Sequence, residues 1–290
     1  QVCYAQEFII IILRSAILEF LMLIFILAFI VVGALIGFMA GLLGIGGGTV
    51  IVPVMHYMAE QMNVPNELTM KMALGTSFSI IIMSTASSAW SHNKRGTILW
   101  KQIPYLGAGC ALGVMIGSLI VNQLSNSLLQ AIFCIFLAYT IIAMIKPKKK
   151  KGNTTSEPNF PLYYFLICGL IIGFIASFIG VAGGVIAIPI LTYLGYEMHK
   201  AIATSAMIGA ILSTFGAISY IYNGWGVEGL PSYSLGYVYL PAFFGIAIMS
   251  ILTAPFGVKL SYKLPVARIR QIFALFLLVI LIRMLSSFIA

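Results

Sequence analysis

GFMAGLLGIGGGTVIVP at residues 37–53 returns as GFIASFIGVAGGVIAIP at residues 173–189. Glycine, phenylalanine, alanine and the final proline recur in register between the two copies. Because clustered glycines disfavour helix and proline lacks a backbone donor, each copy predicts a helix that breaks and restarts. In a membrane such a break is tolerated only where the freed backbone groups are buried in protein or face a water-filled cavity. The pair therefore predicts a functional gap inside a bundle of helices.

The composition places these breaks in a membrane. The 290 residues are 61% hydrophobic and 8% charged, with a mean hydropathy of +1.07. Apolar runs of this length predict spanning helices, and they exclude a β-barrel, whose strands alternate over about ten residues. The apolar segments are 17–43, 49–58, 72–90, 103–121, 128–145, 162–179, 185–194, 201–222, 237–258 and 269–289. We expect an all-α, polytopic integral membrane protein in a lipid bilayer, with no nucleic-acid partner.

A basic and then polar linker, KPKKKKGNTTSEPNFP at residues 146–161, divides the segments into five and five. Such a composition cannot pack a core. Further matches extend the duplication: AIFCIF at 131–136 resembles QIFALF at 271–276, and ALGTS at 73–77 resembles AIATS at 201–205. The sequence thus predicts an extramembrane lead-in (1–16), a first transmembrane repeat (17–145), a cytoplasmic linker (146–161) and a second transmembrane repeat (162–290).

Loop charges indicate that the two repeats have inverted topology. The loop after residue 90 carries Lys94, Arg95 and Lys101, whereas its counterpart after Tyr222 has no Lys or Arg before residue 259. One loop later the basic residues lie in the second repeat, at 259–270. Cytoplasmic loops are enriched in Lys and Arg, so corresponding loops face opposite sides of the cytoplasmic (inner) membrane, with both termini outside. Inverted repeats are typical of secondary transporters.

The second and seventh segments leave the helix count open. Each has about ten apolar residues, short of the ~20 that a spanning helix needs. The first two segments of each repeat could be two crossings or a re-entrant hairpin. The bundle could therefore be described as eight or ten helices.

The breaks are the predicted substrate site. Their positive helix ends would approach each other from opposite membrane faces and bind an anion, although kinks without a ligand are the alternative. The site residues are Gly44, Gly46, Gly47, Gly48 and Thr49 with Gly180, Gly183 and Gly184. Glycines spaced by four, such as Gly33, Gly37 and Gly41 or Gly109, Gly113 and Gly117, are instead interpreted as close helix packing.

Polar residues beside the breaks complete the prediction. Thr76, Ser77, Thr204 and Ser205 occupy duplicated positions, where their hydroxyls could bind an oxyanion or bond back to their own helix. Lys71 and Lys200 could form mouth charges of an anion path, or simply extend to the interface.

Other residue types argue against catalysis and metal binding. His56, His92 and His199 are interpreted as interfacial residues, and the chain has no aspartate and no glutamate in a predicted mid-helix position. Cys110, Cys134 and Cys168 lie in apolar runs without ligand spacing. We expect no enzyme activity, metal or cofactor, and no carboxylate-coupled cation transport.

The paired glycine stretches, the A-x-G/A-T-S positions, the HNKRG loop at 92–96 and the duplication make the chain resemble the TauE/SafE family. This is the sulfite exporter or 4-toluene sulfonate uptake permease group. The resemblance implies transport of sulfite, sulfoacetate or a related organosulfonate, with Pro53 and Pro189 joining the glycines of the substrate region. Ala182 departs from the pattern, because the first copy has Gly46 there.

Three hypotheses follow. The leading one is a secondary transporter of a small sulfur-containing anion, working by alternating access. A passive anion channel is the alternative, which would give currents without saturation. A membrane sulfur-relay protein using the cysteines is the third, although no nucleophile and base are paired. The sequence leaves the direction of transport, the coupling ion and a homo-oligomeric state open.

Overall fold

The computed structural model describes residues 29–42, 47–145, 160–261, 263 and 266–289. Six helices in these ranges are long and apolar enough to cross a membrane: α3 (Asn66–Asn93), α4 (Ile103–Gln123), α5 (Asn126–Ile145), α6 (Leu162–Ile179), α8 (Met198–Asn223) and α9 (Leu240–Ser261). The others are Phe29–Leu42, α2 (Gly48–Gln61), α7 (Gly184–Tyr193) and α10 (Val266–Ile289). A short hairpin of β1 (Ser234–Leu235) and β2 (Val238–Tyr239) precedes α9. The predicted class, a helical polytopic membrane protein, is confirmed.

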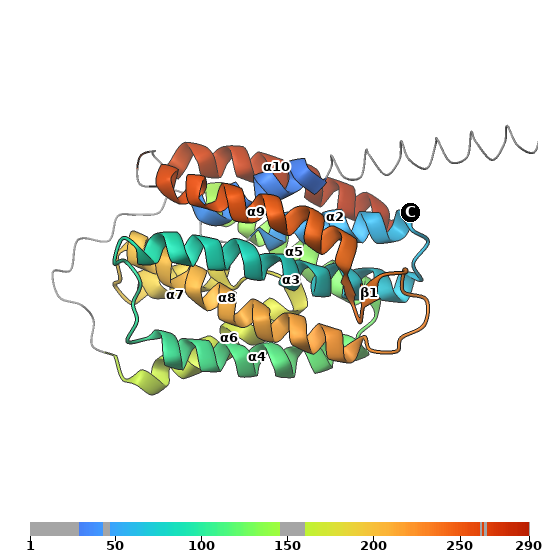
Figure 1. Cartoon of the computed structure of the whole chain (residues 1–290), viewed down its shortest axis with the longest axis horizontal. Helices are drawn as coiled ribbons and strands as arrows, with labels where there is room; N and C mark the ends of the chain where they lie inside the picture. The colour runs from blue at the N-terminus through green and yellow to red at the C-terminus, as the bar shows by residue number, and fades with distance from the viewer. Residues whose placement is uncertain (1–28, 43–46, 146–159, 262, 264–265, 290) are drawn as a thin grey trace, which may run out of the picture.

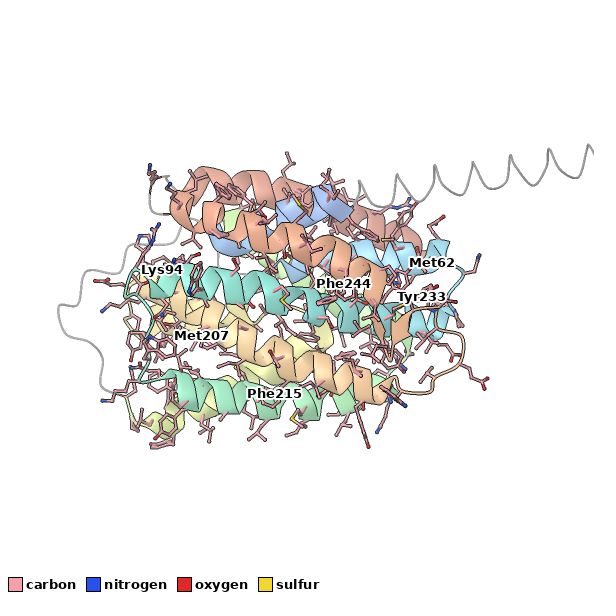
Figure 2. The ribbon with its side chains drawn as sticks, viewed as in Figure 1. Met62, Lys94, Met207, Phe215, Tyr233 and Phe244 are labelled. Carbon is pink, nitrogen blue, oxygen red and sulfur yellow. The ribbon has the colours of Figure 1, made fainter. Side chains whose placement is uncertain are left out.

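The long helices lie side by side along one axis (Figure 1). Helix is the conformation that satisfies every backbone group within the segment, which hydrocarbon demands. Large apolar side chains such as Phe215 and Phe244 are exposed along the helices rather than buried (Figure 2). An apolar surface of this extent suits contact with lipid.

The bundle has a basic end and an opposite end. Lys94 marks the basic end, formed by the loop 94–102, while Met62 and Tyr233 lie at the opposite end (Figure 2). The unbroken α3 joins the two ends over 28 residues, or about 40 Å. Which end faces the cytoplasm stays a prediction from the loop charges.

Glycines spaced by four bring two pairs of helices into backbone contact, as predicted. A Cβ on Gly113 would lie within 2.2 Å of the carbonyl oxygen of Leu170, and one on Gly41 within 2.0 Å of that of Ala254. In each pair, successive glycines of one helix meet successively later residues of the other helix. Therefore α4 runs parallel to α6, and Phe29–Leu42 runs parallel to α9. Because glycine has no side chain, the helix backbones can approach closely. The resulting van der Waals contacts hold helices together in lipid, where no hydrophobic effect drives their association.

The packing follows the duplication. If α3 corresponds to α8 and α4 to α9, then the contact of α4 with α8 has its counterpart in that of α9 with α3. The contacts of α4 with α6 and of α9 with Phe29–Leu42 correspond likewise. These matched contacts support two related halves, whereas their inverted orientation in a membrane stays a prediction.

The pair α6–α7 is a helical hairpin whose two outer ends lie at the basic end (Figure 1). Its two outer ends meet there, since the rings of Phe165 and Tyr196 are 6.4 Å apart and Tyr196 accepts a hydrogen bond from Gln102. Its tip, Gly180, lies against Leu74 and Ser77 in the middle part of α3. With 10 residues, α7 reaches about 15 Å and does not span. Residues 1–16 and most of the linker lie outside the described residues.

Candidate functional site

The restarted helices α2 and α7 begin in the same way. Gly47, with φ 76° and ψ −2°, precedes α2, and Gly183, with φ 73° and ψ −9°, precedes α7. This left-handed conformation costs an L-residue with a side chain roughly 1–2 kcal/mol, which explains glycine at both positions. Neither helix has a side-chain cap within the described chain. The first backbone N–H groups of both helices therefore lack an intrahelical acceptor.

The two breaks touch each other. A Cβ on Gly48 would lie 2.3 Å from the carbonyl oxygen of Gly180 and 2.8 Å from Cα of Val181. Two stretches 132 residues apart in the sequence thus meet backbone to backbone inside the bundle. Gly44 and Gly46, the other glycines predicted for this site, lie outside the described residues.

Helix α3 holds this contact in place. The Ser77 hydroxyl donates a 2.7 Å hydrogen bond to the carbonyl oxygen of Gly180. Leu74 and Ile81, one turn to either side of Ser77, pack against Gly180 and Gly48 respectively. Ser205, the counterpart of Ser77, is equally buried and donates to the carbonyl of Ile202 in its own helix. Of the predicted serines, Ser77 is thus the one shown at the breaks.

Thr76 and Thr204 contact loops of the opposite half. The hydroxyl of Thr76 accepts a 3.0 Å hydrogen bond from the backbone N–H of Tyr239, just before α9. The hydroxyl of Thr204 accepts one of 3.1 Å from the N–H of Leu99, shortly before α4. Both threonines are fully buried. The duplicated hydroxyls therefore anchor a loop at each end of the bundle, a role that the sequence did not suggest.

Thr49 carries a buried hydroxyl without a hydrogen-bond partner in the described structure. It lies in the first turn of α2, directly after the contact of Gly48 with Gly180. A buried hydroxyl that makes no hydrogen bond costs about 1–3 kcal/mol, so this group is one that a bound hydrogen-bonding ligand could satisfy. The assignment of Thr49 to a substrate site stays a prediction.

Sequence reasoning missed further buried hydroxyls. Ser88 on α3 and Ser213 on α8 are fully buried and lack a partner among the described residues. Thr85, one turn before Ser88, contacts Gly209 and corresponds to Ser213 at the spacing of 128 that relates Thr76 to Thr204. The hydroxyl-rich stretch STASS at 84–88 could have indicated these residues, but a run of small residues is equally typical of helix packing.

Comparison with known proteins shows the family of this chain. The family profile described as "Sulfite exporter TauE/SafE" matches residues 29–284. The chain belongs to the TauE/SafE family. It is 41% identical over 260 residues to a "Probable membrane transporter protein" of Haemophilus influenzae, covering 90% of this chain and 98% of the relative. A "Probable membrane transporter protein" of Methanocaldococcus jannaschii is 31% identical over 254 residues, covering 87% and 92%. No solved structure matches.

The TauE/SafE family and these relatives are membrane transporters rather than enzymes, as predicted. The three cysteines of the apolar runs are free and buried: Cys110, Cys134 and Cys168.

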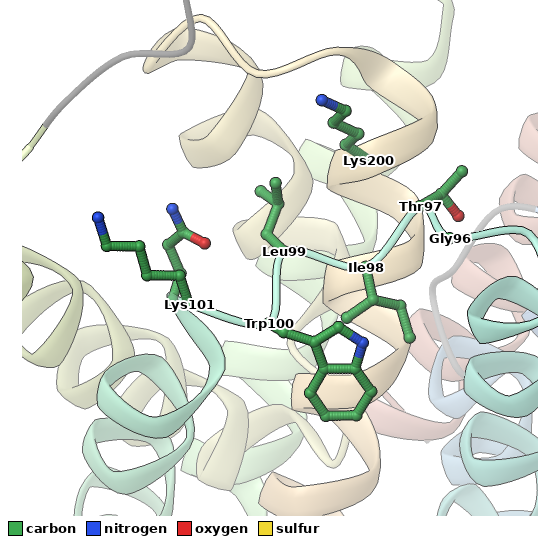
Figure 3. A pocket seen from close by; sticks show the side chains of 8 residues that line it. Gly96, Thr97, Ile98, Leu99, Trp100, Lys101 and Lys200 are labelled. Atoms are coloured by element: carbon green, nitrogen blue, oxygen red, sulfur yellow. The ribbon is translucent and has the colours of Figure 1, made fainter.

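The two predicted mouth lysines of this TauE/SafE protein differ in their surroundings. Lys71 donates a 2.8 Å hydrogen bond to the carbonyl of Asn122, which ties α3 to the last turn of α4. Lys200 instead lines a cavity of about 240 Å³ at the basic end, together with Lys101 and Leu99. Figure 3 shows Leu99 and Lys200 pointing toward the same space. Lys200 thus lines an open space at the basic end, whereas Lys71 fastens two helices, and a role of Lys200 in attracting an anion stays a prediction.

Two histidines of the TauE/SafE chain contradict the interfacial interpretation. His56 and His92 are 3% and 0% exposed, and only His199 lies at the surface. His92 hydrogen-bonds the backbone of Gly41, so it belongs to the packing of α3 against the first broken helix. His56 lies on α2 with Glu60 one turn away, and its Nε2 is 3.3 Å from Oε1 of Glu60. His56 and His92 are therefore packed against protein rather than exposed at the surface of the bundle.

Proposed function

We propose that this protein is a secondary transporter for a small sulfur-containing anion: sulfite, sulfoacetate or a related organosulfonate. The observation that carries the proposal is the buried Thr49 hydroxyl at the start of α2, which has no hydrogen-bond partner among the described residues. Family membership supports transport as the activity. The residues that would bind the anion are the backbone of Gly47 and Gly48, Thr49, and the start of α7 at Gly183 and Gly184.

The donors available at the breaks suit an oxyanion. Sulfite and sulfonates carry three oxygens that accept hydrogen bonds, and a helix N-terminus offers N–H groups together with a positive dipole end. The contacts described between Gly48, Gly180 and Ser77 involve no charged side chain. Neutral donors bind an anion without holding it as firmly as an ion pair does, which suits a carrier that must release its substrate.

In alternating access, the two ends of the bundle would open in turn to a single central site. The loops anchored on Thr76 and Thr204 lie at opposite ends of the bundle, and each anchoring hydrogen bond joins one half of the chain to the other. We expect that opening one end releases the loop at that threonine while the other stays closed. Rocking of one repeat against the other around a central site is the common motion of such folds.

The test compares Thr49→Val with Thr214→Val in proteoliposomes loaded with labelled sulfite or sulfoacetate. Because the Thr49 hydroxyl makes no hydrogen bond within the described residues, valine should leave the unfolding temperature unchanged or slightly raised. Loss of a hydrogen bond to a charged ligand should weaken binding about tenfold or more. Thr214 is exposed and bonds to its own helix, so its variant should behave as wild type.

Two outcomes would contradict the proposal. Unchanged affinity and flux in Thr49→Val would remove Thr49 from the site. Flux that never saturates, with single-channel currents and no counterflow, would identify the protein as a passive pore instead.

A further inference from the structure

His56 is a buried imidazole inside the membrane bundle that the binding of the anion does not use. It is 3% exposed, and neither ring nitrogen has a hydrogen-bond partner in the described structure. An ionisable residue inside a membrane protein is costly to keep and marks a pathway for ions or protons in most cases. His56 lies seven positions after Thr49 along α2, so the two residues are about 10 Å apart.

Glu60 gives this imidazole a connection to the opposite end of the bundle. Its carboxylate contacts Nε2 of His56 at 3.3 Å, and its side chain is 32% exposed close to the end of α2 at Gln61. A proton arriving at Glu60 can therefore reach the buried ring in one short transfer. The contact lacks hydrogen-bond alignment while the ring is neutral and becomes an ion pair once it is protonated.

Among the described residues, the other elements packed on α2 offer His56 no comparable partner. On α10, Arg283 lies over the ring of Tyr57, a residue on the exposed side of α2. On α3, Glu67 and Lys71 lie in the first turns, and Lys71 is bonded to Asn122. Helix α6, at residues 162–179, contains no acidic or basic residue. Glu60 is thus the carboxylate described in contact with His56.

The second half has no equivalent of this pair. At the spacing of 136 that aligns the two glycine stretches, Thr192 stands opposite His56 and Tyr196 opposite Glu60. Thr192 bonds back to Ile188, and Tyr196 accepts from Gln102. Duplicated elements can act alike from both membrane faces, so a titratable pair in one half alone makes the two faces chemically different.

We propose that His56 takes up one proton through Glu60 with each anion bound, which couples transport to the proton gradient. This rests on the proposed anion site at Thr49. One N–H bond forms on the imidazole when the proton arrives, and the same bond breaks when proton and anion leave together. At about 10 Å and an effective dielectric constant of ~20, the imidazolium should tighten anion binding roughly tenfold. By linkage, a bound anion favours protonation by the same factor.

The experiment uses the full chain in proteoliposomes with labelled sulfoacetate and a pH-sensitive dye inside. Sulfoacetate stays ionised between about pH 6 and about pH 8, so any coupling must come from the protein. An inward proton gradient should drive accumulation of sulfoacetate by wild type, with matching proton entry. His56→Gln should keep counterflow at equal pH while losing both gradient-driven accumulation and proton entry. His199→Gln, on the exposed histidine, should resemble wild type.

Each remaining outcome has one meaning. Absence of sulfoacetate flux in wild type would count against the proposed function itself. Flux in wild type without proton entry, or His56→Gln that still accumulates sulfoacetate with proton entry, would overturn the proton coupling alone. If His56→Gln does not fold, the affinity of wild type for sulfoacetate decides, and equal affinity at about pH 6 and about pH 8 refutes the role of His56.

Discussion

Replacing Gly48 with alanine places one methyl group at the contact of the two breaks. The new Cβ would lie 2.3 Å from the carbonyl oxygen of Gly180 and 2.9 Å from Cδ1 of Ile81. The isoleucine methyl can rotate away, whereas the Gly180 carbonyl is held by Ser77. Carbon and oxygen normally approach to about 3.3 Å, so the breaks must separate by about 1 Å.

The energetic cost of Gly48→Ala should be small and its functional cost large. Overpacking costs about 1–3 kcal/mol, and alanine recovers about 1 kcal/mol through its higher helix propensity. The protein should therefore still fold. A hydrogen bond to the anion that lengthens from about 2.9 Å to about 3.9 Å is lost, so transport should fall at least tenfold.

The assay pairs sulfite or sulfoacetate uptake in proteoliposomes with thermal unfolding in detergent. Gly107→Ala is the matched control, because this helical glycine on α4 would bring its Cβ only against the flexible end of Ile211. It should transport at the wild-type rate. A Gly48→Ala variant that is folded and transports with wild-type rate and affinity would refute the position of the site.

Two further predictions concern the glycine turns and the lysines. Gly183→Ala should lower the unfolding temperature more than Gly226→Ala. Both glycines have positive φ, so alanine is strained at both positions, but only at Gly183 would the new methyl group also meet neighbouring side chains. Equal shifts in thermal unfolding would contradict this. Lys200→Met should slow anion uptake strongly at low salt and less at high salt, because salt already screens the lysine charge of the wild type. Lys71→Met should leave uptake nearly unchanged. Uptake measured across ionic strengths decides, and salt-independent loss in Lys200→Met would count against a steering role.

Much of the fold could be predicted because its causes are local. Long apolar runs predict helices wherever hydrocarbon leaves no alternative, and glycine clusters predict where those helices break. The left-handed Gly47 and Gly183 fulfil that expectation in each copy. The beginning of α3 at Asn66 rather than at residue 72 was missed, because its first turns are polar and lie toward the bundle end.

The site was less predictable because it depends on which face of a helix meets which neighbour. An apolar helix buried on all sides carries little periodic signal, so nothing distinguished Thr76, which holds a loop, from Ser77, which holds a break. The depth of His56 was equally hidden. Its distance from a membrane face depends on where the broken helix starts, and that start is set by a contact with Gly180, far away in the sequence.

The two halves share backbone features while several side chains between them differ. His92 and Tyr220 stand at corresponding positions late in α3 and α8, and each bonds to the backbone one turn before a break, at Gly41 and Ser177. Different chemistry here serves the same packing, so it leaves the halves equivalent. His56 has no such substitute, because Thr192 cannot take up a proton at neutral pH. Features repeated in both halves are therefore candidates for binding the substrate, and features present in one half are candidates for giving transport its direction.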